Sequence, residues 1–141
     1  MNSSANGLLG DAVAVLAVLL TLAVAAGLLW AQLVDPLPDT ALTEATVADQ
    51  FDIDGWYVVL AAVAGAAAGL VLTLWRTRDP VATVLLLVAG AALAAWLMAV
   101  TGAVASDLVV TAPSAYFMWP ITALLGAVVV LWARRGSHQR E

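Results

Sequence analysis

Residues 56–75 read WYVVLAAVAGAAAGLVLTLW, a stretch without a single charged side chain. The hydrocarbon core of a bilayer is about 30 Å thick, and a helix that rises about 1.5 Å per residue crosses it in about 20 residues. A continuous helix also satisfies its own backbone hydrogen bonds, which lipid cannot do. The stretch therefore predicts a transmembrane helix between Trp56 and Trp75.

The composition of the whole chain supports a membrane location. Of 141 residues, 64% are hydrophobic and 11% are charged, whereas soluble domains average roughly 45–50% and about 25%. The mean hydropathy is +1.01. A soluble chain of this size exposes too much surface to cover so many apolar side chains. We therefore expect an integral, multi-pass protein of the cell membrane, with the lipid bilayer as its first partner.

Three more stretches are long and apolar enough to cross a bilayer. Together with the first they predict an all-α bundle of four transmembrane helices. Asp54 is expected to cap the second helix, and Asp79 followed by Pro80 to start the third. Pro113 and Pro120 predict an interfacial turn or a kink where the fourth helix begins. The predicted spans are about 8–34, 56–75, 81–101 and 116–133.

The distribution of charge predicts the orientation. Basic residues occur in the predicted inner loop 76–80 and after the last span, whereas the predicted outer loop 35–55 is acidic and lacks basic residues. By the positive-inside rule both termini face the cytoplasm, giving an N-in/C-in topology. The basic rim that sets this topology, and that could contact lipid headgroups, consists of Arg76, Arg78, Arg134 and Arg135.

Aromatic residues cluster near the predicted span ends. Tryptophan and tyrosine favour the membrane interface, so we expect an outer belt of Trp30, Trp56, Tyr57, Tyr116 and Trp119. Trp75 and Trp132 are expected at the inner interface. Trp96 falls inside a span, where it should pack between helices or face lipid.

The acidic stretch QFDIDG, residues 50–55, resembles the start of a calcium-binding EF-hand loop. That loop requires an acid at its first position and a glutamate at its twelfth. This chain has Gln50 and Ala61 at those positions, which excludes an EF-hand. Two interpretations stay open: acids simply tolerated on the outer side, or an outer-loop interaction with a cation. The residues that would carry such an interaction are Asp49, Asp52 and Asp54.

Small residues spaced four apart occur on three of the predicted helices. Such spacing lets two helix backbones approach closely in lipid. We expect these faces to pack the chain against itself, with self-association or a partner helix as the alternative. The predicted helix-packing residues are Ala61, Gly65 and Gly69 on the second helix, Ala23 and Gly27 on the first, and Gly90 and Ala94 on the third.

The inventory of reactive side chains is small. There is no cysteine, and the single histidine, His138, lies near the C-terminus. No acidic or basic residue lies deep within a predicted span, although carriers, channels and membrane enzymes usually depend on such residues. We therefore predict no catalytic, cofactor-binding or metal-binding residue and no cofactor.

These observations favour a non-enzymatic accessory, scaffold or assembly component that works through helix contacts and its outer loop. A small oligomeric transporter or channel is the alternative, with a pore lined by threonines. An outer-surface sensor, responding through the acidic loop, is a weaker third hypothesis. The expected partners are another membrane protein or further copies of the chain, and not nucleic acid, since the net charge is −5. The threonines that would line the pore of such a transporter or channel are Thr21, Thr73, Thr83, Thr101 and Thr122.

Four segments together resemble a known family. They are LLWAQLVDPLP (28–38), FDIDGWYVVLAAVAGAAAGL (51–70), WRTRDP (75–80) and LLLVAGAALAAWLMAVTG (85–102). The chain resembles a family of small four-span membrane proteins from actinobacteria that carry a domain of unknown function. The resemblance implies a four-span architecture and a bacterial source. It implies no activity, cofactor or catalytic residue.

Overall fold

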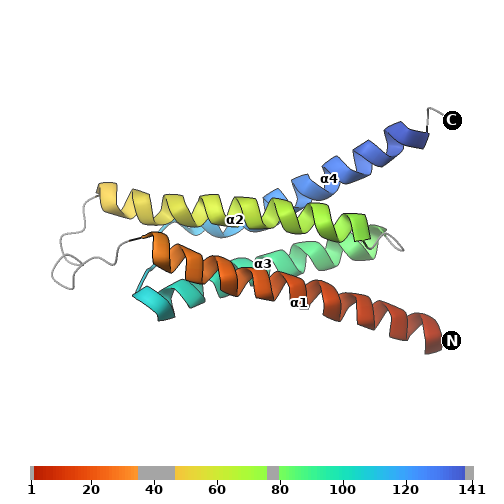
Figure 1. Cartoon of the computed structure of the whole chain (residues 1–141), viewed down its shortest axis with the longest axis horizontal. Helices are drawn as coiled ribbons and strands as arrows, with labels where there is room; N and C mark the ends of the chain where they lie inside the picture. The colour runs from red at the N-terminus through yellow and green to blue at the C-terminus, as the bar shows by residue number, and fades with distance from the viewer. Residues whose placement is uncertain (1, 35–46, 76–79, 139–141) are drawn as a thin grey trace.

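The structure is a computed structural model that describes residues 2–34, 47–75 and 80–138 (Figure 1). These residues form four α-helices, α1 (Asn2–Leu33), α2 (Val47–Trp75), α3 (Pro80–Ser106) and α4 (Met118–His138), and one short 3₁₀ helix, η1 (Pro113–Phe117). Each α-helix contributes to a segment long and apolar enough to cross a membrane. These segments are Gly10–Leu33, Gln50–Leu74, Val81–Ser106 and Pro113–Arg135. The predicted all-α bundle of four transmembrane helices is confirmed, and the chain is a multi-pass membrane protein.

The four helices are arranged as two closely packed pairs. α1 runs along α3, and α2 runs along α4. The pairs join through smaller contacts between α3 and α4 and between α1 and α2. Both ends of the chain lie at the same end of the bundle, where α1 and α4 diverge (Figure 1). We call the opposite end, where α1 finishes and the segment 107–112 joins α3 to η1, the outer end, after the predicted orientation.

The second helix begins earlier than the sequence predicts. α2 starts at Val47, so residues 47–55 of the predicted acidic outer loop are helical, and the prediction that Asp54 caps this helix is wrong. The physical reason lies in the spacing of Ile53, Tyr57 and Ala61, which are all buried. Residues four apart lie on one face of a helix, so the buried face of α2 continues past the expected boundary.

Two other helices also extend beyond one end of their predicted spans. α1 begins at Asn2, and α3 continues to Ser106. Asp107 then leaves the helix with a φ of 52°, and its amide still donates to the carbonyl of Ala103 at 2.9 Å. Pro113 opens η1, which leads into α4. Pro120 lies in the first turn of α4, where a missing backbone N–H removes no bond within the helix.

Three aromatic residues of the predicted outer belt are buried inside the bundle. Trp30, Tyr57 and Trp119 are each 0% exposed, so their placement among lipid headgroups is wrong. Trp30 reaches the interior because Gly102 on α3 has no side chain, and the indole ring occupies that space. It contacts Tyr57 edge to face, with ring centroids 5.2 Å apart. The rings of Trp30 and Tyr57 pack together in the core of the outer half.

The remaining tryptophans are exposed where their side chains are described. Trp56 is partly exposed, and Trp132 is strongly exposed near the end that carries the termini. Trp96 is 57% exposed, so of the two alternatives for this residue it faces lipid. The third helix begins at Pro80, as predicted, whereas its expected cap Asp79 lies outside the described residues. The side chains of Trp75 and His138 also lie outside them.

Candidate functional site

Asp54 fixes the segment that joins α3 to η1. Its carboxylate accepts hydrogen bonds from the Thr111 amide at 3.1 Å, the Thr111 hydroxyl at 2.7 Å and the Ala112 amide at 3.2 Å. The two backbone N–H groups precede Pro113 and have no helical partner, so a carboxylate is a suitable acceptor for them. Asp54 therefore connects α2 to a segment nearly 60 residues further along the chain. The sequence carries no signal for this pairing with Thr111.

Further hydrogen bonds connect the helices at the outer end. The Trp30 indole N–H donates to the Ile53 carbonyl at 3.0 Å, which joins α1 to α2. The Tyr57 hydroxyl donates to the Ala95 carbonyl at 2.6 Å, which joins α2 to α3.

Two longer bonds extend this network to the neighbouring elements. Ser106 donates to the Ala31 carbonyl of α1 at 3.2 Å, and Gln50 donates to the Val109 carbonyl at 3.4 Å. Hydrogen bonds between transmembrane helices contribute about 0.6 kcal/mol each on average. The outer end is thus held by several weak bonds that involve α1, α2, α3 and the segment 107–112.

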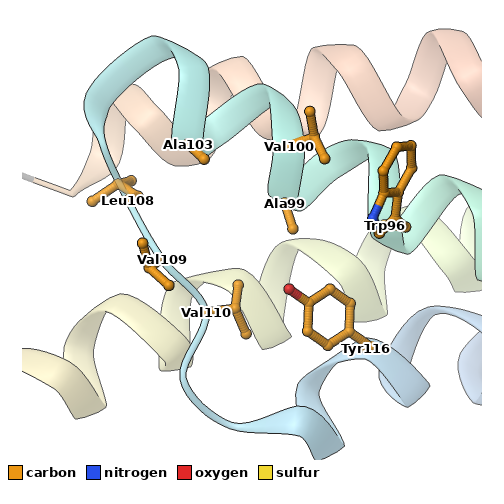
Figure 2. Close-up of a pocket in the computed structure, with 8 residues that line it drawn as sticks. All are labelled: Trp96, Ala99, Val100, Ala103, Leu108, Val109, Val110 and Tyr116. Atoms are coloured by element: carbon orange, nitrogen blue, oxygen red, sulfur yellow. The ribbon is translucent and has the colours of Figure 1, made fainter.

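A pocket of about 150 Å³ lies at this end, between the outer half of α3, the segment 107–112 and η1 (Figure 2). Its walls are largely apolar. The Tyr116 hydroxyl points from η1 toward the middle of the pocket, on the side of Ala99 (Figure 2). The pocket is lined by Trp96, Ala99, Val100, Ala103, Leu108, Val109, Val110 and Tyr116.

The predicted acidic interaction site is only partly described. The side chain of Asp49 lies outside the described residues, and so do Asp35, Asp39 and Glu44. Asp52 is exposed, whereas Asp54 is occupied by Thr111 and Ala112. Within the described parts of the chain, no group of three or more histidines or acids could hold a metal ion.

The predicted rim of arginines is also described in part. Arg76 and Arg78 lie outside the described residues, as does Arg140. Arg134 donates from its guanidinium to the carbonyl of Leu74 at 3.0 Å, which connects α4 to the end of α2. Arg135 is exposed at the same end of the bundle.

The small residues of α2 face α4. A Cβ added at Gly65 would lie 2.6 Å from the Trp119 carbonyl oxygen, and one at Gly69 would overlap the backbone of Ala123. Ala61 is completely buried on the same face. Gly126 of α4, which the sequence analysis missed, approaches Ala66 and Gly69 in return. The signal that could have revealed this face is the pair Ala123 and Ala127, spaced four apart.

The small residues of α1 and α3 face each other in the second pair. A Cβ at Gly27 would lie 2.7 Å from the Met98 carbonyl oxygen, and one at Gly90 would lie 2.6 Å from a methyl group of Leu19. Ala23 and Ala94 are both fully buried. The predicted small-residue faces therefore lie within the two helix pairs of one chain.

Comparison with known proteins adds no relative. No protein-family model, no curated protein and no solved structure matches the chain.

Proposed function

We propose that the protein is a non-enzymatic accessory, scaffold or assembly component of the cell membrane. The observation that carries this proposal is the use of the interior for packing. The buried side chains are almost all aliphatic or aromatic, and Thr73 is the one buried polar residue in the described part of the chain. Helices packed in this way provide a rigid body that presents its surfaces to other molecules.

The hydrogen bonds of the threonines also support this proposal over the transporter alternative. Thr21 donates to the Ala17 carbonyl, Thr101 to the Leu97 carbonyl and Thr122 to the Met118 carbonyl, at 2.7–2.8 Å. Threonine commonly satisfies its hydroxyl in this way within a helix. A hydroxyl that donates to its own backbone is not available as a donor to a passing solute. A conducting pore would then have to form between copies of the chain.

The expected partner is another membrane protein. The described charged side chains lie near the ends of the spans. Apolar side chains would therefore contact the partner inside the bilayer, and the polar side chains at the ends of the bundle would contact it at the membrane surfaces. We also propose a bacterial source, because the chain resembles four-span membrane proteins from actinobacteria. This resemblance implies no activity.

Affinity purification from native membranes tests this function. A tag after Glu141, extraction in a mild detergent and intact-mass analysis should recover a larger membrane protein at a fixed ratio. A tagged four-span protein of unrelated sequence is the control for non-specific recovery. Recovery of the chain only as multiples of its own mass would contradict the accessory function and favour the oligomeric transporter or channel.

A further inference from the structure

The pocket at the outer end opens where the bundle faces lipid. Trp96 and Val109 belong to its lining and are 57% and 65% exposed, and the neighbouring Val104 is 83% exposed. In a membrane protein the molecules that bathe such a surface are lipids. The inner wall is formed by smaller side chains, Ala99 and Ala103, which leave space beside α3.

The size and position of the pocket fit part of a lipid molecule. An apolar cavity of roughly 150 Å³ accommodates a guest of about the size of benzene, and this pocket has a similar volume. A hydrocarbon core about 30 Å thick takes about 20 residues of helix, and counted from Val81, where the membrane-crossing segment of α3 begins, these residues end near Val100. Ala99 and the Tyr116 hydroxyl beside it (Figure 2) therefore lie near the outer boundary of the core, which is the level of the lipid ester linkages. A hydrocarbon chain of the outer leaflet can extend inward from this level along α3, against Ala99 and Trp96.

One polar group distinguishes this pocket from an ordinary gap between side chains. The Tyr116 hydroxyl points into it (Figure 2) and donates to no other described residue. Its ring is held against Tyr57, with centroids 5.9 Å apart, and Tyr57 is itself fixed by its bond to Ala95. A hydroxyl among apolar walls gains from an acceptor. In a glycerophospholipid, the carbonyl oxygens of the ester linkages are the acceptors closest to the hydrocarbon chains.

We propose that this pocket binds one ester-linked glycerolipid of the outer leaflet. Its chain lies against Trp96 and Ala99, and the Tyr116 hydroxyl donates a hydrogen bond to an ester carbonyl oxygen. The site is independent of the proposed accessory function, since it requires only the bundle and the segment that Asp54 holds. It gives the protein a specific lipid ligand in addition to the surrounding bilayer.

The test compares lipids that differ only in the ester carbonyl. Purified protein is delipidated and incubated with a diester phosphatidylcholine or with its diether analogue of equal chain length. Native mass spectrometry then counts the retained lipid. We expect one diester molecule per chain, and retention of the diether weaker by about two- to tenfold, as loss of one hydrogen bond implies. Tyr116→Phe should reduce diester retention to the level of the diether.

Two further variants keep the test decisive. Ala103→Phe fills the pocket and should abolish specific retention of both lipids, whereas Trp132→Phe, on an exposed residue at the other end, should leave it unchanged. A melting temperature close to that of the original chain shows that each variant is folded. Equal retention of diester and diether lipids, or retention unaffected by Ala103→Phe, would overturn the proposal.

Discussion

At the scale of single residues, two buried tryptophans differ in one hydrogen bond. Trp30 and Trp119 are both fully buried. The indole N–H of Trp30 donates to the Ile53 carbonyl, whereas that of Trp119 has no hydrogen-bond partner among the described residues. A buried polar group without a partner reduces stability. The two positions therefore form a natural pair for measuring what the bond between α1 and α2 contributes.

Replacing each tryptophan by phenylalanine should give different losses of stability. Both changes remove the same volume, but only Trp30→Phe removes a hydrogen bond. We expect Trp30→Phe to reduce the free energy of unfolding by about 0.5–1.5 kcal/mol more than Trp119→Phe does. Denaturant titration in mixed micelles measures both values. A larger loss for Trp119→Phe would contradict the assignment of these bonds.

Asp54 should matter more than its neighbour Asp52. Asp54→Ala removes the acceptor of three hydrogen bonds to Thr111 and Ala112, and we expect a loss of about 1–3 kcal/mol. Asp52 is exposed, so Asp52→Ala should change stability by less than about 0.5 kcal/mol. Hydrogen exchange at the amides of Thr111 and Ala112 provides a local readout. Unchanged protection of these amides in Asp54→Ala would show that the carboxylate does not hold this segment.

At the scale of helices, packing within each pair depends on close backbone approach. In α2, a Cβ at Gly69 would lie 2.8 Å from the carbonyl carbon of Ala123, whereas a Cβ at Gly55 would meet nothing within 4 Å. The same helix therefore offers a crowded glycine and an open one. Steric overlap is costly in a packed interior, and alanine otherwise favours a helix over glycine by about 1 kcal/mol.

Substitution by alanine should thus have opposite effects at the two glycines. Gly69→Ala should destabilise the protein by about 1–3 kcal/mol because α2 and α4 must separate. Gly55→Ala should leave stability unchanged or raise it by up to about 1 kcal/mol. Thermal unfolding of both variants in the same detergent checks this. A stabilising effect of Gly69→Ala would contradict the packing of this pair.

The four helices could be predicted from sequence because each contains an uncharged run of sufficient length. The start of α2 could not, because the helical turns before Trp56 are held by distant residues, Trp30 and Thr111. The burial of Trp30 and Tyr57 depends on which helices are neighbours, which spacing alone does not specify. The pocket depends on the path of the segment 107–112, for which the sequence contains no recognisable pattern.

At the scale of the whole molecule, both termini lie at one end of the bundle (Figure 1). The positive-inside rule predicts that this end faces the cytoplasm. Since the chain lacks cysteine, single cysteines can report the orientation without background. A membrane-impermeant maleimide should label Asp39→Cys, in the predicted outer loop 35–55, in intact cells and Glu141→Cys only after permeabilisation. The reverse pattern would contradict the predicted orientation.

The central claim is that the protein acts through contacts and does not itself pass a solute across the membrane. The most direct measurement is flux through vesicles that contain the purified chain alone, for protons, monovalent ions and small neutral solutes. We predict flux equal to that of vesicles without protein. Flux above that level would contradict the claim, provided it is lost when Thr21, Thr73, Thr83, Thr101 and Thr122 are changed to valine.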